Sequence, residues 1–437
     1  MTEVLVGLLF VALPVVLMAA LRWSALKTGI ALLALAVAYS LAVLGLGALG
    51  PALEGLIKGA RVAAIAFSAY IFYLAYREAG YEQELKAKVL GGGAERAALA
   101  VYLGGFLEAV SGYGVPAAVV APLLASAGLS ETRALVAALL GHSWAVPFAS
   151  LGVPTLALSL VTDVGPKGLS VTTAALLAAP FALLTALTSR TVGASSKHAI
   201  GLACLSLALM VTVASLGRFS ALVAGAVGLV LVFAMRGRLH LLRPLAPYMA
   251  LAALLTLVSL AGLRSLEVQA ATVLLLAVLL VVSKRGDPCR FVSSLTPALK
   301  TAVTLVVLST AAILASRSGM LGAIAQQLTL LGEAYTYLVP LVGFLGAYVS
   351  GSCTASNLLF GVLQREFAEV VGVSKELVLA FHNAGGSVGS VVSPAKVAVG
   401  ASTLRSADES AAFRKVLPLA LAVAVVLCIE AVLLATL

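Results

Sequence analysis

The sequence predicts an all-α polytopic membrane protein, with about 12 membrane helices in two inverted repeats that contain broken helices or re-entrant hairpins. Of its 437 residues, 62% are hydrophobic and only 11% are charged, whereas soluble globular chains carry about 25% charged residues. Apolar stretches long enough to span a bilayer recur along the chain. Two polar, glycine-rich segments also repeat one another. This composition excludes soluble enzymes, nucleic-acid-binding proteins and disordered scaffolds.

The apolar stretches give the order of the predicted membrane helices. They lie near residues 4–21, 28–49, 62–76, 98–110, 132–151, 170–189, 199–216, 219–235, 246–263, 267–283, 298–316, 335–349, 376–403 and 416–436. The first is expected to be a retained helix, since its basic residue Arg22 follows the apolar run instead of preceding it. Short basic clusters separate many of the later stretches. By the positive-inside rule these clusters face the cytoplasm, and an odd number of crossings in each repeat then places both termini outside.

The net charge and the cysteines indicate no further partner. The formal charge of +10 is spread over the short clusters and forms no continuous basic patch, so no nucleic acid is expected to bind. The four cysteines lie far apart without a CxxC spacing, which argues against a zinc site or a disulfide framework. No metal and no cofactor are predicted.

Two segments of the chain resemble each other. The first, residues 106–154, begins near SGYGVP and ends in SLGVP, and the second, residues 350–396, begins with SGSCTASN and contains SVVSP near its end. Ser111 precedes its counterpart Ser350 by 239 positions, and Pro154 precedes its counterpart by 240, so the register is almost constant. Duplicated segments that hold broken helices at matching positions are typical of secondary transporters.

This duplication predicts the domain organisation. We expect a first inverted repeat over residues 1–217 and a second over residues 218–437, each containing one of the two hairpin segments. In transporters built this way, substrate binds at the interface between the repeats.

The breaks in both segments predict a ligand cavity. Glycine and proline interrupt helices, and unpaired backbone is tolerated at membrane depth only inside protein or beside a watery cavity. Helix N-termini at such breaks would hold an anion such as a carboxylate. Asparagine occurs only twice in the chain, both times in the second segment. The hydroxyl and amide groups beside the breaks belong to Ser111, Ser350, Ser352, Thr354, Ser356, Asn357, Asn383, Ser387 and Ser393.

Four ionisable side chains lie within the apolar motifs: Glu108, His142, His382 and Lys396. A charge at the bilayer centre costs about 2.5–3.5 kcal/mol, so such residues are functional candidates by default. Glu108 is predicted to couple transport to protons, against the alternative of a structural neutral carboxyl group. The histidines are candidates for the same role, although buried neutral histidines that bond to the backbone are common. Lys396 is predicted to hold a substrate carboxylate or to pair with Glu108, unless it snorkels to the interface.

Four strings, FLEAVSGYGVPAAV (106–119), AVPFASLGVP (145–154), SGSCTASNLLFG (350–361) and AGGSVGSVVSP (384–394), resemble the paired signatures of the lactate permease family of 2-hydroxymonocarboxylate transporters. The resemblance spans both halves of the chain in the right order. It implies uptake of lactate or glycolate with protons, and re-entrant hairpins around the substrate. The family's motif positions correspond here to Glu108, Gly112, Gly114, Pro116, Ser350, Ser352, Thr354, Ser356, Asn357, Gly385, Gly386 and Pro394.

Two positions depart from the family pattern. Cys353 stands where the family typically has Asp, and Ser390 stands where it has Lys. An acid and a base are thus both missing. Lys396 is then the basic side chain of the second segment's core motif, and we expect it to supply the anion site together with Asn357 and Asn383.

These observations predict a multi-pass secondary active transporter of the plasma membrane. The favoured function is proton-coupled symport of lactate- or glycolate-type 2-hydroxymonocarboxylates. A sodium-coupled carboxylate symporter and an organic-anion exchanger remain as alternatives. An enzyme is not predicted, because HExxH and P-loop motifs are missing. The expected partners are a small carboxylate, a proton or sodium ion and the lipid bilayer, and a homodimer is left open.

Overall fold

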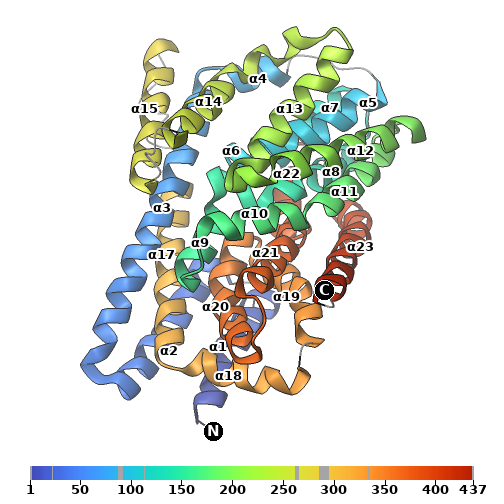
Figure 1. The fold of residues 1–437 in the computed structure, drawn as a ribbon. Helices are drawn as coiled ribbons and strands as arrows, with labels where there is room; N and C mark the ends of the chain where they lie inside the picture. Colours follow the sequence, from blue (N-terminus) through green and yellow to red (C-terminus); the bar gives the residue numbers. More distant parts are fainter. Residues whose placement is uncertain are drawn as a thin grey trace.

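The computed structural model describes residues 2–21, 23–86, 92–112, 114–260, 265–284, 295–332 and 334–435. All regular elements in these ranges are helices (Figure 1). In the first half they are α1 (Thr2–Val15), α2 (Ala25–Leu44), α3 (Leu49–Glu78), α4 (Tyr81–Lys86), α5 (Gly93–Ala98), α6 (Gly104–Val110), α7 (Val115–Ser126), α8 (Glu131–His142), α9 (Ala149–Thr162), α10 (Pro166–Leu176), α11 (Ala178–Thr191) and α12 (Ser196–Val213). In the second half they are α13 (Ser220–Met235), α14 (Ala246–Leu260), α15 (Leu266–Lys284), α17 (Thr296–Arg317), α18 (Met320–Leu328), α19 (Ala334–Ser350), α20 (Cys353–Val371), α21 (Lys375–Val391), α22 (Pro394–Ala401) and α23 (Glu409–Ala435).

Several of these helices are long and apolar enough to cross a membrane. Within the described residues, five stretches meet this criterion: Ala25–Glu78, Glu131–Thr162, Ser196–Met235, Ala298–Arg317 and Glu409–Leu434. The pair α10 and α11, bent by 44°, would form a sixth. Other apolar helices, such as α7 and α19, are shorter. The predicted class of helical membrane protein is confirmed, while the number of about 12 crossings stays a prediction.

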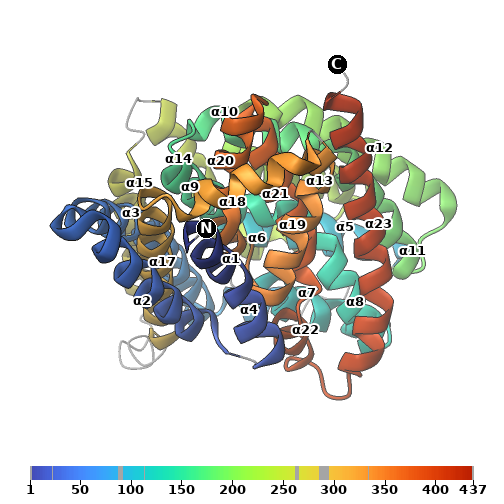
Figure 2. The same ribbon diagram turned by 90° about the horizontal axis from the view of Figure 1, so that it is seen from below.

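Four helices form one flank of the molecule. α17 packs along α3, and α2 and α15 pack against this pair; Figures 1 and 2 both show the four helices on the same side. Glycine allows the close approach of α3 and α17. A Cβ atom on Gly55 would lie 2.6 Å from Thr310 Cα, and one on Gly59 would lie 2.7 Å from Val306 Cα. Small residues at a helix contact are the usual way to pack helices tightly in a membrane.

The second-half hairpin lies beside this flank. α19 and α20 are separated only by Gly351 and Ser352, and both helices pack against α21. A Cβ atom on Gly385 would overlap the carbonyl oxygen of Pro340, and one on Gly389 would overlap that of Phe344. Glycines of α21 therefore allow α19 to pack backbone against backbone.

The first-half segment is interrupted in the same places. A continuous helix runs from Gly93 to Val110 through a π-helical stretch, and α7 begins after a break that contains Gly112 and Gly114, with φ of 62° and 77°. A second interruption follows α8. It includes the 3₁₀ turn Ser143–Phe148 and, inside α9, three consecutive residues with positive φ.

The two segments contact each other directly. α9 packs on α20, and α10 packs on α21. Thr172 of α10 donates a hydrogen bond of 2.5 Å to Glu376, which lies in the first turn of α21. The loop after α22 likewise meets the start of α8, where the Ser406 hydroxyl lies 3.0 Å from Glu131 Oε2. The core of the molecule is thus built from both halves of the chain.

Candidate functional site

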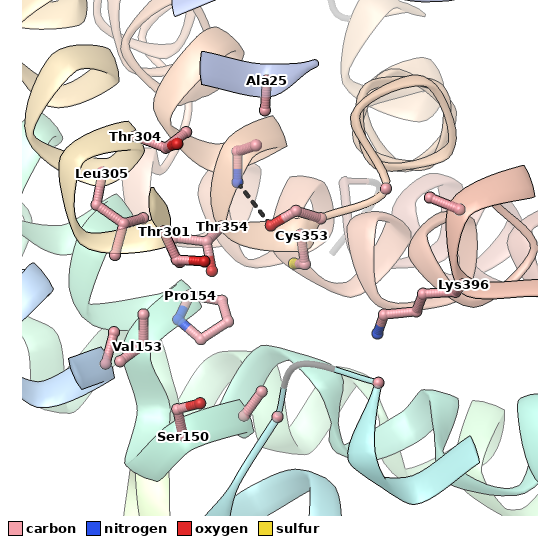
Figure 3. A pocket seen from close by; sticks show the side chains of 18 of the residues that line it. Ala25, Ser150, Val153, Pro154, Thr301, Thr304, Leu305, Cys353, Thr354 and Lys396 are labelled. Carbon is pink, nitrogen blue, oxygen red and sulfur yellow. Dashed lines mark hydrogen bonds between the residues drawn. The ribbon is translucent and has the colours of Figure 1, made fainter. Parts of the chain in front are cut away.

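A cavity of about 350 Å³ lies where the four helix interruptions meet. One wall comes from the α6–α7 break and from the interrupted start of α9, and another from the α19–α20 break and the start of α22. The flank closes the remaining side with α17, Ala66 of α3 and the beginning of α2. Figure 3 shows this arrangement, with Lys396 on the side opposite Thr301 and Leu305.

Local sequence explains why α20 and α22 begin at the cavity. Ser352 caps α20 by accepting the backbone N–H of Ala355 at 3.2 Å. Ser393 caps α22 by accepting the N–H of Lys396 at 3.3 Å, with Pro394 in the first helical turn. Serine as N-cap and proline at the first helical position are the preferred residues for starting a helix. Both helix N-termini thus lie at the interruptions that border the cavity.

Lys396 and Glu108 form an ion pair across the two halves of the chain. Lys396 Nζ lies 3.4 Å from Glu108 Oε1, and the two side chains are only 12% and 2% exposed. The second oxygen, Glu108 Oε2, is buried and has no hydrogen-bond partner among the residues that the structure describes. Figure 3 shows the Lys396 side chain pointing into the cavity. The predicted pairing of Lys396 with Glu108 is therefore observed, and the lysine does not snorkel away from the site.

Some of the hydroxyl groups around the cavity already donate hydrogen bonds to backbone carbonyl oxygens. Ser150 Oγ donates to Ser111 O at 2.8 Å, and Thr304 Oγ1 donates to Lys300 O at 2.7 Å. Within the part of the chain that the structure describes, Thr354 Oγ1 makes no hydrogen bond. The cavity therefore presents charged groups together with hydroxyls of different hydrogen-bonding capacity, in a largely apolar surrounding.

The two asparagines lie behind the cavity wall. Asn357 Nδ2 donates to Pro154 O and to Asn383 Oδ1, both at 2.9 Å. Asn383 Nδ2 in turn donates to Thr155 Oγ1 at 2.8 Å. Both asparagine side chains are fully buried, and neither lines the cavity. They join α9 of the first half to α20 and α21 of the second half.

The predicted site residues, including those already described, divide into two groups. Those that line the cavity are Glu108, Gly112, Gly114, Ser352, Thr354 and Lys396. Those outside the lining are Ser111, His142, Ser350, Ser356, Asn357, His382, Asn383, Gly385, Gly386 and Ser393. Four of the second group bond within their own stretch of backbone: Ser111, His142, Ser350 and Ser393.

The two histidines are fully buried. His142 Nδ1 lies 2.6 Å from Ala138 O, while its Nε2 is buried and finds no partner within the described ranges of the chain. His382 Nε2 lies 3.3 Å from Ser356 O. Each ring thus bonds to the backbone, as expected of the structural alternative, and a proton-handling role for either ring stays a prediction.

Of the two departures from the family pattern, only one lies at the cavity. Cys353 lines it, and its Sγ is 3.4 Å from Asn383 Oδ1. Ser390 is buried within α21, where its hydroxyl donates to Ser387 O.

The α17 residues of the lining were not predicted. Lys300, Thr301, Thr304, Leu305 and Leu308 all face the cavity. The available signal was weak: two threonines three positions apart in a largely apolar segment, a pattern that also occurs in helices that face lipid.

Comparison with known proteins identifies the family. The family model for L-lactate permease matches residues 3–238 and 205–437. The chain belongs to the L-lactate permease family. The resemblance predicted from the four motif strings is therefore confirmed, and together with the apolar helices it identifies an integral membrane protein.

Individual relatives carry the same family's names. The L-lactate permease of Streptococcus iniae is 26% identical over 344 residues, which cover 66% of this chain and 72% of that protein. The L-lactate permease of Bacillus subtilis (strain 168) is 36% identical over 113 residues, or 26% of this chain and 20% of that protein. The glycolate permease of Escherichia coli (strain K12) is 39% identical over 98 residues, 22% and 18% of the two chains. The chain thus matches only about a fifth of the length of the last two relatives.

Proposed function

We propose that this member of the L-lactate permease family carries a lactate- or glycolate-type 2-hydroxymonocarboxylate across the plasma membrane, coupled to protons. The observation that supports this most directly is the Glu108–Lys396 pair at a cavity between the two halves. Lys396 offers a positive charge and Ser352 and Thr354 offer hydroxyls, which suits one carboxylate group. The names of the lactate and glycolate permeases among the relatives agree with this substrate class.

The proposal includes an inverted-repeat topology. One repeat would comprise residues 1–217 and the other residues 218–437, with both termini outside. The matching positions of the interruptions in the two hairpin segments, 106–154 and 350–396, support it. The direct contacts of α9 with α20 and of α10 with α21 are those expected where two repeats meet around a substrate site.

Proton coupling is assigned to Glu108. Substrate carboxylate and Glu108 would compete for Lys396, because one ammonium group lies between two anions. Protonation of Glu108 would release Lys396 for the substrate, so that one proton and one carboxylate bind together. The unpartnered oxygen Glu108 Oε2 leaves room for that proton without breaking another hydrogen bond.

The test is uptake by purified protein in liposomes with imposed pH or sodium gradients. We expect a pH gradient, and not a sodium gradient, to drive accumulation of lactate and glycolate. Glu108→Gln should abolish this accumulation and leave exchange of labelled for unlabelled lactate intact. Glu430→Gln is the control, since Glu430 is a half-buried carboxyl group in an apolar helix but lies outside the cavity.

Each other result would contradict a definite part of the proposal. Accumulation driven by sodium alone would replace the proton as coupling ion. Uphill uptake that persists in Glu108→Gln would exclude Glu108 as the coupling residue. Failure to carry any 2-hydroxymonocarboxylate would reject the substrate class.

A further inference from the structure

The face of α17 that lines the cavity has a polar and an apolar half. Thr301 and Thr304 lie one helical turn apart, and Leu305 and Leu308 extend the same face. Side chains at positions i, i+3, i+4 and i+7 share one side of a helix, so these four form a single stripe. α17 belongs to the flank with α2 and α3, and not to either hairpin segment.

The hydrogen bonds already present decide what each hydroxyl can offer to a ligand. A hydroxyl has one proton to donate and two lone pairs that accept. The hydroxyl group of Thr304 donates its proton to Lys300 O. Toward a ligand, Thr304 Oγ1 is therefore a hydrogen-bond acceptor. Ser352 Oγ accepts a backbone N–H and keeps its proton. The partly buried donors for an anion, Ser352 Oγ and Lys396 Nζ, therefore lie on the hairpin side of the cavity, while Thr304 of α17 contributes an acceptor. Lys300, the cation of α17 in the lining, is exposed.

A 2-hydroxymonocarboxylate requires hydrogen-bond donors for one of its groups and an acceptor for the other. Its carboxylate accepts hydrogen bonds, its 2-hydroxyl group donates one, and the rest of the second carbon is apolar. We propose that α17 recognises the 2-hydroxyl group through Thr301 and Thr304 and packs Leu305 against the neighbouring alkyl group. This inference rests on the proposed function and names the residues that select hydroxy acids over unsubstituted acids.

The arrangement in the cavity supports this assignment. Thr301 and Thr354 both line the cavity and come from α17 and α20, which pack against each other; in Figure 3, Thr304 and Leu305 lie on the same side of the cavity as Thr301. A carboxylate bound near Thr354 at the start of α20 would therefore place the adjacent 2-hydroxyl group within reach of α17. Ser150 also has its proton committed, but it lies away from this group, beyond Pro154 in the same view.

The experiment compares uptake of lactate with uptake of propionate, which lacks only the 2-hydroxyl group. Initial rates are measured in liposomes for the parent, Thr301→Val, Thr304→Val and the double variant. Valine keeps the shape of threonine and removes the hydroxyl. Thr310→Val is the matched control, because Thr310 lies on the same helix and donates to Val306 O in the same way but does not line the cavity.

We expect the parent to prefer lactate. Each of the cavity variants should lower that preference about three- to tenfold, the value of one ordinary hydrogen bond, while propionate uptake stays at the parent rate. Thr304→Ser, which retains the hydroxyl, and Thr310→Val should keep the full preference.

Three outcomes would overturn the inference. They are an unchanged preference in the double variant, an equal loss of lactate and propionate uptake in it, and a parent that carries both acids equally well. A parent that carries neither acid would instead reject the proposed function, so the two failures are distinguishable.

Discussion

Removing both partners of the Glu108–Lys396 pair should cost less than the sum of the costs of removing each one alone. At 3.4 Å and an effective dielectric constant of about 20, two unit charges attract by about 5 kcal/mol. Both side chains are largely withdrawn from water, so much of this attraction offsets the cost of desolvation. Lys396→Met alone would leave Glu108 buried without its counter-charge. A buried pair broken in this way destabilises a protein by about 3–5 kcal/mol.

A double-mutant cycle measures this coupling. The parent, Glu108→Gln, Lys396→Met and the double variant are unfolded in detergent, and the free energies of unfolding are compared. We expect the double variant to recover about 2 kcal/mol relative to the sum of the two single effects, which is within the range for residues in direct contact. Each variant is also titrated with lactate, and Lys396→Met should weaken binding at least tenfold, or ~1.4 kcal/mol.

The control pair is Lys58 and Asp163, which lie 2.5 Å apart but with Asp163 half exposed. The same cycle there should give at most about 1 kcal/mol, because exposed ion pairs contribute little. Unfolding effects at Glu108 and Lys396 that add within about 0.5 kcal/mol would refute the reasoning. They would show that the two groups do not depend on each other in the folded protein.

Two further predictions follow from other contacts. Asn383→Ala should destabilise the protein by about 2–3 kcal/mol, since it leaves buried donors and acceptors unpaired, but should change lactate affinity less than twofold; a large loss of affinity with normal stability would instead show that Asn383 binds substrate. Asp163→Asn should weaken the cluster in which Lys58 and Arg317 contact Asp163, and should lower the free energy of unfolding by at most about 1 kcal/mol, because half-exposed ion pairs contribute little. A loss of several kcal/mol would contradict this reasoning.

The residues that break helices were predictable from the sequence. Gly112 and Gly351 adopt positive φ at the two hairpin tips, and Ser352 and Ser393 cap the helices that follow. These are local preferences of the backbone, so the printed residue types are enough to predict them. The pairing of Lys396 with Glu108 was also predictable, since a buried charge requires a partner and few candidates exist in the motifs.

The roles of the other polar residues depend on tertiary contacts that a sequence does not contain. The scarcity of asparagine drew attention to Asn357 and Asn383, but a buried amide serves equally well to bind a ligand or to join helices, and Asn357 joins helices. α17 shows the same limit within one helix. Thr304 lines the cavity and Thr310 does not, although both donate to the carbonyl oxygen four residues earlier. The packing of α3, α2 and α20 against α17 decides which face of α17 meets the cavity.

The interruption of α9 is the place where these contacts converge. Ser150 and Leu151 are buried at φ of 48° and 65°, a conformation that costs a non-glycine residue about 1–2 kcal/mol. This conformation persists because hydrogen bonds to both hairpin segments hold the turn in place. Ser150 donates to the break of the first hairpin at Ser111 O, while Asn357 of the second hairpin donates to Pro154 O.

The part of the cavity wall that α9 contributes is therefore a strained turn, and a hydrogen bond to each hairpin segment holds it. If either hairpin shifted, one of these bonds would be lost and the strain could relax. A substrate that bridges the start of α20 and Lys396 would stabilise the arrangement in which both bonds are present. This links occupancy of the cavity to the relative position of the two halves, which is the coupling that a transporter requires.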